Sequence, residues 1–568
     1  MRAMVPRINS RLIAMQFEAA PGLARLRMLK ESFGAATPDF VEAVLDEAAR
    51  FATGYLARLN DIGDREGCAL VEGRVRTPPG HRDAYDAYVA GGWPTLDQPT
   101  GEGGLGLPLA LAFAVQEIFD RDCPAFGMLP VPQRSAARLI AAHGDAAMKA
   151  EWLPSLVSGA WAATICISEA EAGSDVARVR TRATSLGDGE WAITGEKNWI
   201  SFGDHDLAPR IGHCLLARTA TAEGLSLFLV PDRFGEARNG VIVRRIEEKM
   251  GLHASPTCAL GFEGARGRLI GTEGRGLQQM FVMITNMRLA TGAQGLAIAS
   301  GAADLALAYA RERRQGGRGT APVPINRHPD VQRLLLEQAA KVEVLRGLLL
   351  AAANLGDLAA CEPDEEARED AAALLQWLLP LVKTTGGEFA FEVASDAVQI
   401  LGGAGYTREW PVEQMLRDAR VLTIFEGTTG IQALDLLHRR LRGDRRGLRV
   451  FLVRARADAA ASGAARDLLP TLELLEDAAE QLVAMSDPRA AEAGATAFLH
   501  LAALAATGWI AARLVAVEGS DQEAERLRAV GRHWLALIPA RAASCHAESV
   551  AGLALVEAFA AIDGDCGG

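Results

Sequence analysis

The sequence predicts a mostly helical α+β protein in which an all-β segment separates two helical regions. Three observations predict it. The 568 residues are rich in apolar side chains (49%) and poor in aromatic ones (6%), which favours helices. Apolar positions recur at helical spacing from residue 38 to about 160 and again from 276 onward. Between these regions, short β-like runs alternate with turn residues.

The first region opens with an extension, 1–37, for which we expect loose order and one short helix over 22–33. A helical domain over 38–160 should follow. Its first helix is predicted over 39–59, where Phe40, Val41, Val44 and other apolar residues recur at i, i+3, i+4 spacing. Further helices of this domain are expected over 81–90, 107–119, 133–143 and 147–156.

One loop of this domain imitates a cofactor motif. Gly101-x-Gly103-x-x-Gly106 matches the dinucleotide-binding fingerprint letter for letter. That motif requires a strand before it and a helix opening on it. Here it follows Trp93-Pro94-Thr95 and a polar stretch, so we predict a plain loop.

The middle segment, 161–275, is predicted to be a small β domain of sandwich or barrel type. Asp188-Gly189 has the composition of a tight hairpin turn. Strands are expected over 162–168, 190–195, 197–202, 213–219, 225–231, 240–246 and 258–264.

Helices return at 276 and predict a four-helix bundle over 276–440, followed by an additional helical domain over 441–568. An arginine-rich linker, 439–456, is expected between them. The bundle helices are predicted over 277–310, 329–355, 365–401 and 429–441. The helices of the tail are predicted over 468–485, 489–517 and 521–559.

Composition argues against several classes of protein. The net charge of −12 disfavours a general polyanion binder. We expect no membrane span, because no apolar run of about 18 residues is present, and no signal peptide, so a cytoplasmic location is expected. No C-x-x-C pair occurs, which gives no support to a metal site or a disulfide framework. The cysteines are at positions 68, 123, 166, 214, 258, 361, 545 and 566.

The stretch 399–432 concentrates the chemistry. Gly402-Gly403 would let a bulky ligand approach the backbone. Glu426 is an acid inside an apolar run, where burial would raise its pKa and suit it to act as a general base. Thr429 and Gln432 have capping-box spacing, so a helix should begin there with free amides that suit a phosphate. The alternative for Glu426 is a capping acid at the surface.

This stretch closely resembles the C-terminal signature of the acyl-CoA dehydrogenase family: Q-I-L-G-G-x-G-[YF], then R-D, then [YF]-E-G-T. The order of helices, β domain and helical bundle is similar too, so the resemblance covers about 38–440. The helical tail resembles a larger branch, typified by 3-methylmercaptopropionyl-CoA dehydrogenase. Local support for that branch comes from 63–67 with 74–79, 203–206, 246–251 and 427–432.

The resemblance implies an FAD site that begins in the run CISEAEAGSDV, 166–176, similar to the family's C-x-[ST]-E-P-x-A-G-S-D. Ser168 would bond near flavin N5, and Ser174 would bond phosphates of FAD or CoA. Backbone groups of Ile165 and Ile167 would flank the flavin pyrimidine. Ala170 replaces the usual proline and Glu171 adds a charge, so a looser turn is expected.

Two further motifs complete the implied flavin site. In K-N-W-I-S, 197–201, Trp199 would pack on the flavin and Ser201 would bond near N5; the alternative for Trp199 is a core position. Arg313, in an R-x-R motif, would contact the pyrophosphate of FAD in a neighbouring subunit, or else lie on a solvated helix face. The other implied cofactor contacts are Gln399, Gly402, Gly403 and Thr428.

For the substrate, the resemblance implies Arg288, Gly427 and Ser174 as contacts and Glu426 as the catalytic base. Some branches carry the base on an earlier helix, but 280–295 contains no Asp or Glu here. The implied reaction is α,β-dehydrogenation of an acyl-CoA, with the α-proton taken by Glu426 and the β-hydride passed to flavin N5. A 3-methylmercaptopropionyl-CoA-like or other short to medium acyl-CoA is the expected substrate. Electron-transfer flavoprotein as acceptor and a homodimer are the expected partners.

Two alternatives stay open at this point. A DNA-associated, alkylation-response branch shares the fold, flavin and tail, and the arginine-rich run 438–457 could bind phosphates. We prefer the interpretation in which this run is a solvated linker whose arginines pair with nearby acidic side chains. An acyl-thioester oxidase or tailoring flavoenzyme would carry the same motifs.

Overall fold

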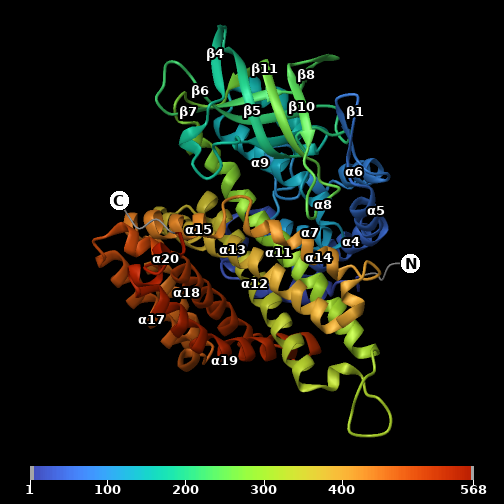
Figure 1. Cartoon of the computed structure of the whole chain (residues 1–568), viewed down its shortest axis with the longest axis vertical. Coiled ribbons are helices and arrows are strands. Elements are labelled where there is room, and N and C mark those ends of the chain that lie inside the picture. Colours follow the sequence, from blue (N-terminus) through green and yellow to red (C-terminus); the bar gives the residue numbers. More distant parts are fainter. Residues whose placement is uncertain (1–4, 564–568) are drawn as a thin grey trace. The chain divides into compact units, whose positions relative to one another are not determined.

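The computed structural model describes residues 5–563, which divide into two compact units. The β unit comprises residues 46–290, and the helical unit comprises the remaining described residues. The boundaries fall inside helices α4 (Pro38–Phe51) and α11 (Gly276–Glu312). Figure 1 traces the elements of both units along the chain.

The helices of the β unit pack around an aromatic cluster. Phe51, at the end of α4, contacts the rings of Tyr88, Trp93 and Phe119 with centroid distances of 6.5, 6.0 and 5.1 Å. The predicted first helix continues past Phe51 through a π-helical turn, η1 (Ala52–Leu56). The other helices are α5 (Ala57–Glu66), α6 (His81–Ala90), α7 (Leu109–Asp122), α8 (Pro124–Gly127), α9 (Pro130–His143) and α10 (Ala146–Ser158).

The glycine-rich stretch before α7 is the loop that the sequence predicted. Helix α6 and the 3-10 turn Trp93–Thr95 come directly before it, not a strand. Its backbone bonds run back to that turn, from Leu105 N to Thr95 O and from Gly106 N to Gln98 O, both 2.9 Å. A side chain at Gly104 would lie 2.0 Å from Gln98 O. These glycines therefore serve a tight loop rather than a dinucleotide.

The sheet of the β unit closes on itself. Its order is β10-β11-β5-β4-β6-β3, and β7 pairs with both β11 and β6, so five strands form a ring. This observation selects the barrel from the two predicted β architectures. The strands are β3 (Ala162–Cys166), β4 (Arg182–Gly187), β5 (Glu190–Ser201), β6 (Ile211–Arg218), β7 (Leu225–Pro231), β10 (Val241–Ile246) and β11 (Thr257–Leu269).

Several strand predictions needed correction. The two strands predicted over 190–202 are one continuous strand, β5, and β4 was missed because its exposed, polar residues lack an apolar pattern. The predicted turn at Asp188-Gly189 is confirmed: it joins β4 to β5 with φ of 50° and 78°. A short hairpin was also missed, β1 (Ala69–Val71) with β2 (Arg74–Arg76), as was the pair β8 (Arg233–Phe234) and β9 (Ala237–Arg238).

In the helical unit, α11, α12 (Pro329–Cys361) and α13 (Glu365–Leu401) form the long helices of the bundle. Helices α11 and α13 approach closely, because a side chain at Gly295 would lie 2.1 Å from Gly386 O. The bundle continues with α14 (Val412–Ala419), α15 (Thr429–Asp435) and the π-helical η8 (Leu436–Gly443).

The tail is helical throughout most of its length, and the predicted arginine-rich linker is helix as well. Within that run, Arg446 pairs with Asp370 on α13 at 2.7 Å, and Arg442 donates to Leu482 O at 2.8 Å. These contacts show that the run is an ordered part of the helical unit and not a linker. The tail helices are α16 (Arg446–Ala461), α17 (Ala465–Ala484), α18 (Pro488–Val515), α19 (Gln522–Val550) and α20 (Phe559–Asp563).

The N-terminal extension is more ordered than predicted. It forms α1 (Ser10–Ala19), α2 (Leu23–Leu29) and α3 (Glu31–Gly34). Buried Glu343 on α12 explains part of this order, because it accepts from Gln16 at 2.6 Å and from Arg526 of α19 at 2.9 Å. One carboxylate thus joins the extension, the bundle and the tail.

Two helices, Pro329–Cys361 and Pro488–Val515, are long and apolar enough to cross a membrane by length and composition. In each, 72% of the apolar window is buried inside the protein, as in the core helices of a helical bundle. None of the seven cysteines within 5–563 forms a disulfide, and no group of three potential metal ligands occurs there. Cys566 lies outside the described residues.

Candidate functional site

The flavin motifs of the β unit meet at the end of β3. Ile165 lies in β3, and Ile167 and Ser168 follow it with partly exposed side chains. The neighbouring motif reaches them directly: Asn198 N donates to Ser168 O, and Lys197 Nζ donates to Ile167 O, both at 2.9 Å. The fold thus brings the two sequence motifs into one patch.

Trp199 lies on a β-bulge in this patch. Lys197 pairs with Leu260 and Ile200 with Cys258, so two residues of β5 face one residue of β11. Trp199 takes a φ of +65°, which costs a non-glycine residue about 1–2 kcal/mol. Its side chain is 60% exposed, so the alternative core position is excluded. A bulge is a common device for redirecting a side chain beside a functional site.

A buried ion pair holds the patch together. Lys197 is fully buried, and its Nζ lies 2.8 Å from Glu169 Oε1. Glu169 also accepts from Thr181 Oγ1 at 2.6 Å and from Arg180 N at 2.7 Å. Burial acts to raise the pKa of Glu169, but the bonds and charge of Lys197 together with these donors hold it below its ordinary value.

The turn after Ser168 is not loosened by the loss of proline, contrary to expectation. Glu169 and Ala172 form an antiparallel bridge with bonds of 3.0 and 3.1 Å around Ala170-Glu171. Glu171 pairs with Arg180 at 2.5 Å across the surface. Ser174 beyond the turn is exposed.

A polar network supports the turn that follows β5, and the sequence reasoning missed its role. Asp204, three residues after Ser201, accepts from Arg74 Nε and Val75 N, both at 2.8 Å. Asp206 accepts from Thr77 Oγ1 at 2.7 Å. The stretches 74–79 and 203–206, which pointed to a family branch, therefore fasten the β1–β2 hairpin to the turn that follows Ser201.

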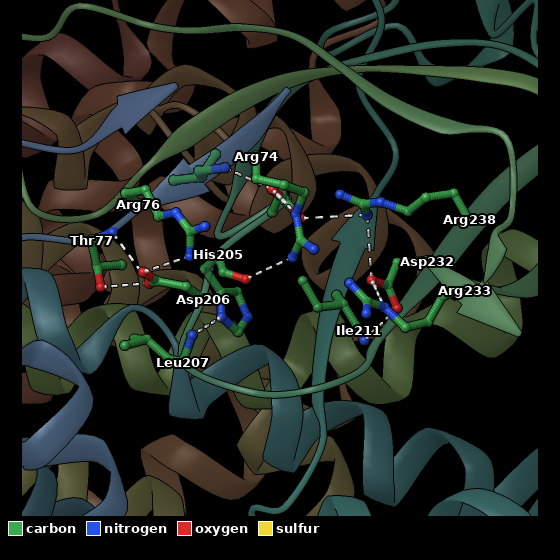
Figure 2. A network of polar contacts seen from close by, with 12 residues as sticks. Arg74, Arg76, Thr77, His205, Asp206, Leu207, Ile211, Asp232, Arg233 and Arg238 are labelled. Atoms are coloured by element: carbon green, nitrogen blue, oxygen red, sulfur yellow. Dashed lines mark hydrogen bonds and ion pairs between the residues drawn. The ribbon is translucent and has the colours of Figure 1, made fainter. Parts of the chain in front are cut away.

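Aspartate and arginine side chains extend this network along the barrel. Figure 2 shows Arg238 and Arg233 beside Asp232. Arg238 lies 3.6 Å from Asp232 and 3.9 Å from Asp204, and Arg233 bonds Asp232 at 3.1 Å. His205 in the same turn is fully buried, and burial lowers its pKa to about 4. The imidazole is therefore neutral at pH 7, and the network is structural.

The β-unit patch fits a flavin. An exposed indole offers a flat apolar face, and the partly exposed side chains of Ser168 and Ser201 stand on the same pair of motifs. Such a combination of an aromatic face with a few fixed polar groups is typical of cofactor sites. Trp199, Ser168 and Ser201 are the residues that would hold the ring.

In the helical unit, Glu426 lies in a strained loop before α15. Its φ is +55° and that of Gly427 is +92°. The helix cap is one residue earlier than predicted: Thr428 Oγ1 accepts from Ile431 N at 3.3 Å. Gln432 does not complete a capping box but donates to Glu426 O at 3.0 Å. The side chain of Glu426 is partly buried.

Lys383 is a second support of this loop that the sequence did not reveal. It is fully buried in the middle of α13 and donates from Nζ to Gly427 O at 2.7 Å. Side-chain donors from α13 and α15 thus hold the consecutive carbonyls of Gly427 and Glu426. Only the approach of α13 to this loop identifies Lys383, because nothing in its sequence context marks it.

The residues assigned to a neighbouring subunit's FAD lie elsewhere in the helical unit. Gln399, Gly402 and Gly403 are exposed, and a side chain at either glycine would meet no atom within 4 Å. Gln399 lies 11 residues beyond Glu388, which is about 16 Å along α13. Arg313, just past α11, is exposed at the same end of the bundle, since Tyr309 and Trp410 make a ring contact at 5.1 Å.

Arg288 lies on α11 with 7% of its surface exposed, and its contact with the substrate stays a prediction. The same helix carries no acid over 280–295, as the sequence indicated.

Comparison with protein families finds three matches along the chain. The N-terminal domain of acyl-CoA dehydrogenase matches residues 39–160, the middle domain 164–265 and the C-terminal domain 274–441.

Among curated proteins, 3-methylmercaptopropionyl-CoA dehydrogenase of Ruegeria pomeroyi is 41% identical over 516 residues, 85% of this chain and 88% of that protein. The broad-specificity linear acyl-CoA dehydrogenase FadE5 of Mycobacterium tuberculosis is 35% identical over 433 residues, 72% of this chain and 70% of that protein. A solved acyl-CoA dehydrogenase with FAD from Bacillus anthracis has a TM-score of 0.73 at 21% identity and covers 93% of this chain and 91% of its own. The last comparison shows that the tail belongs to a known version of the fold.

Proposed function

The chain belongs to the acyl-CoA dehydrogenase family and is an FAD-dependent oxidoreductase acting on acyl-CoA thioesters, and we propose that Glu426 is its catalytic base. The observation that carries this proposal is the loop itself. Glu426, a non-glycine residue at φ +55°, is held by Gln432 through its own carbonyl and by Lys383 through the carbonyl of Gly427. Strain that the surroundings maintain in this way is typical of functional sites.

The residues would act as follows. The Glu426 carboxylate takes the α-proton, and the Glu426 amide donates to the thioester carbonyl, which stabilises developing enolate charge and acidifies the α C–H. Gly427, without a side chain, leaves room beside that carbonyl. Trp199, Ser168 and Ser201 hold the flavin ring. FAD, when bound, supplies the acceptor for the β-hydrogen.

A 3-methylmercaptopropionyl-CoA-like or other short to medium acyl-CoA is the proposed substrate. Its support is the 41% identity to the Ruegeria pomeroyi enzyme over most of both chains. A homodimer is proposed as the active unit. The support is that Arg313, Gln399 and Gly402–Gly403 are exposed, and that Gln399 lies far along α13 from Glu388, which is near the Glu426 loop. Electron-transfer flavoprotein is the proposed electron acceptor, and the cytoplasm the proposed location.

The experiment is anaerobic mixing of the FAD-loaded protein with a panel of acyl-CoAs, followed by the flavin absorbance. We expect bleaching by short acyl-CoAs. Glu426→Gln should still bind FAD and substrate but reduce flavin about 10²–10⁴-fold more slowly, since general-base catalysis supplies that factor. Glu480→Gln, an exposed tail residue, is the matched control. Normal reduction by Glu426→Gln would place the base elsewhere, and an active monomer in light scattering would contradict the dimer.

A further inference from the structure

The loop that carries Glu426 is linked to the tail by a chain of three side chains. Thr429, the first residue of α15, donates from Oγ1 to Glu388 Oε1 at 3.3 Å. The same carboxylate meets His500 Nε2, which lies 3.3 Å from Oε1 and 3.1 Å from Oε2. Glu388 is on α13, five residues after Lys383, and His500 is on α18 of the tail.

This chain acts on the same short segment as Lys383 and Gln432. Those two residues hold the carbonyls of Gly427 and Glu426, whereas Glu388 holds the side chain of Thr429. The segment from Glu426 to Thr429 is therefore fixed at both of its ends. One of the fixing groups is a carboxylate whose own partner comes from the tail.

From this geometry we infer that His500 is a positioning residue for the catalytic loop: its imidazole orients Glu388, and Glu388 fixes the first turn of α15 behind Glu426. The inference rests on the proposed role of Glu426. It gives the additional helical domain a part in catalysis, because a tail residue takes part in setting the geometry of the base.

The charges around His500 define how the link responds to pH. Glu388 and Glu392 of α13 and Glu548 of α19 act on the imidazole, and all three are acids. The hydrogen bond and the charge of Glu388 raise the pKa of His500 above its ordinary value, against the effect of burial. Charged imidazolium bonds a carboxylate more strongly than neutral imidazole does. The link is therefore firm below this raised pKa and weakens as pH rises through it.

The chain offers a matched control. His438 of η8 pairs with Glu492 of α18 at 3.0 Å, so it too is a histidine–glutamate pair between the bundle and the tail. In the described residues that pair makes no bond with Glu388 or Thr429. His438→Ala should remove a comparable contact without touching the loop.

The test measures the rate of flavin reduction at saturating acyl-CoA from pH 5.5 to 9 in holoenzymes. We expect His500→Ala to slow it roughly three- to tenfold at low pH, less than the 10²-fold that a 1 Å misplacement can cost. The rate of His500→Gln, which keeps a donor but not the charge, should lie between those of wild type and His500→Ala. The ratio of wild-type to His500→Gln rates should approach one at high pH. Glu388→Gln combined with His500→Ala should be no slower than the slower single variant. His438→Ala should follow wild type.

A second readout does not depend on turnover. Hydrogen exchange of the amides over 425–432 should quicken in His500→Ala and Glu388→Gln but not in His438→Ala. If the wild type reduces flavin and His500→Ala matches His438→Ala in rate and exchange, the inference is wrong while the proposed function stands. If the wild type reduces no flavin, the proposed function fails, and the exchange data alone support or overturn the link.

Discussion

The candidate site of the β unit and that of the helical unit each contain a residue held at positive φ, but the supports of the two residues differ. In the β unit, Trp199 is held at φ +65°, and in the helical unit Glu426 is held at φ +55°. Trp199 is fixed by its own neighbours, through the ladder to β11 and the ion pair of Lys197 with Glu169. Glu426 is fixed by side chains from other helices, Lys383 and Gln432.

The difference teaches where a local change should be felt. The backbone bonds between β5 and β11 that hold Trp199 also stabilise the barrel, so a mutation that disrupts them should lower the stability of the β unit. A loop supported by remote side chains can lose geometry while the helices that supply those side chains remain folded. We therefore expect mutations at the candidate site of the β unit to change stability and cofactor binding, and mutations at the Glu426 loop of the helical unit to change the rate.

The largest effect on stability should come from Lys197→Met in the β unit. Removing one member of a buried pair leaves Glu169 without its charge partner and should destabilise the β unit by about 3 kcal/mol. Urea denaturation monitored by hydrogen exchange of β5 measures it. Lys149→Met, in the same unit on a partly exposed helix position, should change little. An unchanged β unit in Lys197→Met would contradict the local-support view.

The stability of the two units should depend on pH with opposite sign. Burial lowers the pKa of His205 and of His213 to about 4, below the unfolded value of about 6.5, so unfolded chains bind more protons in this window. The β unit should lose stability as pH falls from about 6.5 toward 4, by up to about 3 kcal/mol per histidine. His500, with its raised pKa, contributes below about pH 6.5 and loses this contribution as pH rises.

Unit-resolved denaturation between pH 4.5 and 8.5 measures both slopes. Replacing His205 by Asn should flatten the acid slope of the β unit and leave the helical unit unchanged. Parallel slopes in the two units would contradict the assignment of these histidines.

A smaller effect is expected for Trp199→Ala. Because the indole is 60% exposed, its loss should leave stability unchanged. The loss of an aromatic contact worth about 1 kcal/mol should weaken FAD binding about five- to tenfold. Fluorescence titration of the apoprotein with FAD measures this. Trp191, on the same strand, packs on Phe228 at 5.4 Å, so Trp191→Ala should show the reverse pattern of lower stability.

The smallest effect is expected in the arginine-rich run. Arg445 and Arg449 are exposed, so their replacement by Gln should leave activity and stability unchanged. Arg446→Gln should lower stability slightly, because it loses Asp370 and Glu369. Gel-shift assays at about 150 mM salt should detect no saturable binding of duplex DNA. Binding that disappears in the Arg445 and Arg449 variants would instead favour a DNA-associated function.

Much of this protein could be read from its sequence because the signals are local. Long apolar periodicity predicted α11, α12, α13 and α18 to within a few residues at most of their ends. The Asp188-Gly189 turn and the loop at Gly101–Gly106 follow from turn chemistry. The family, the cofactor and the candidate base rest on ordered motifs whose spacing the sequence alone displays.

The tertiary structure decided the contacts between residues that are far apart in the sequence. β4 carries little apolar signal, and the strands of the β1–β2 hairpin have only three residues each, so only pairing partners define them. The motif K-N-W-I-S includes Lys197 but does not show that its side chain is buried, and nothing in the sequence around Lys383 marks it. Burial next to a carboxylate or a carbonyl gives each lysine its role. The link from His500 to Thr429 joins residues 71 positions apart through a third, because helix packing, which no local pattern encodes, sets such contacts.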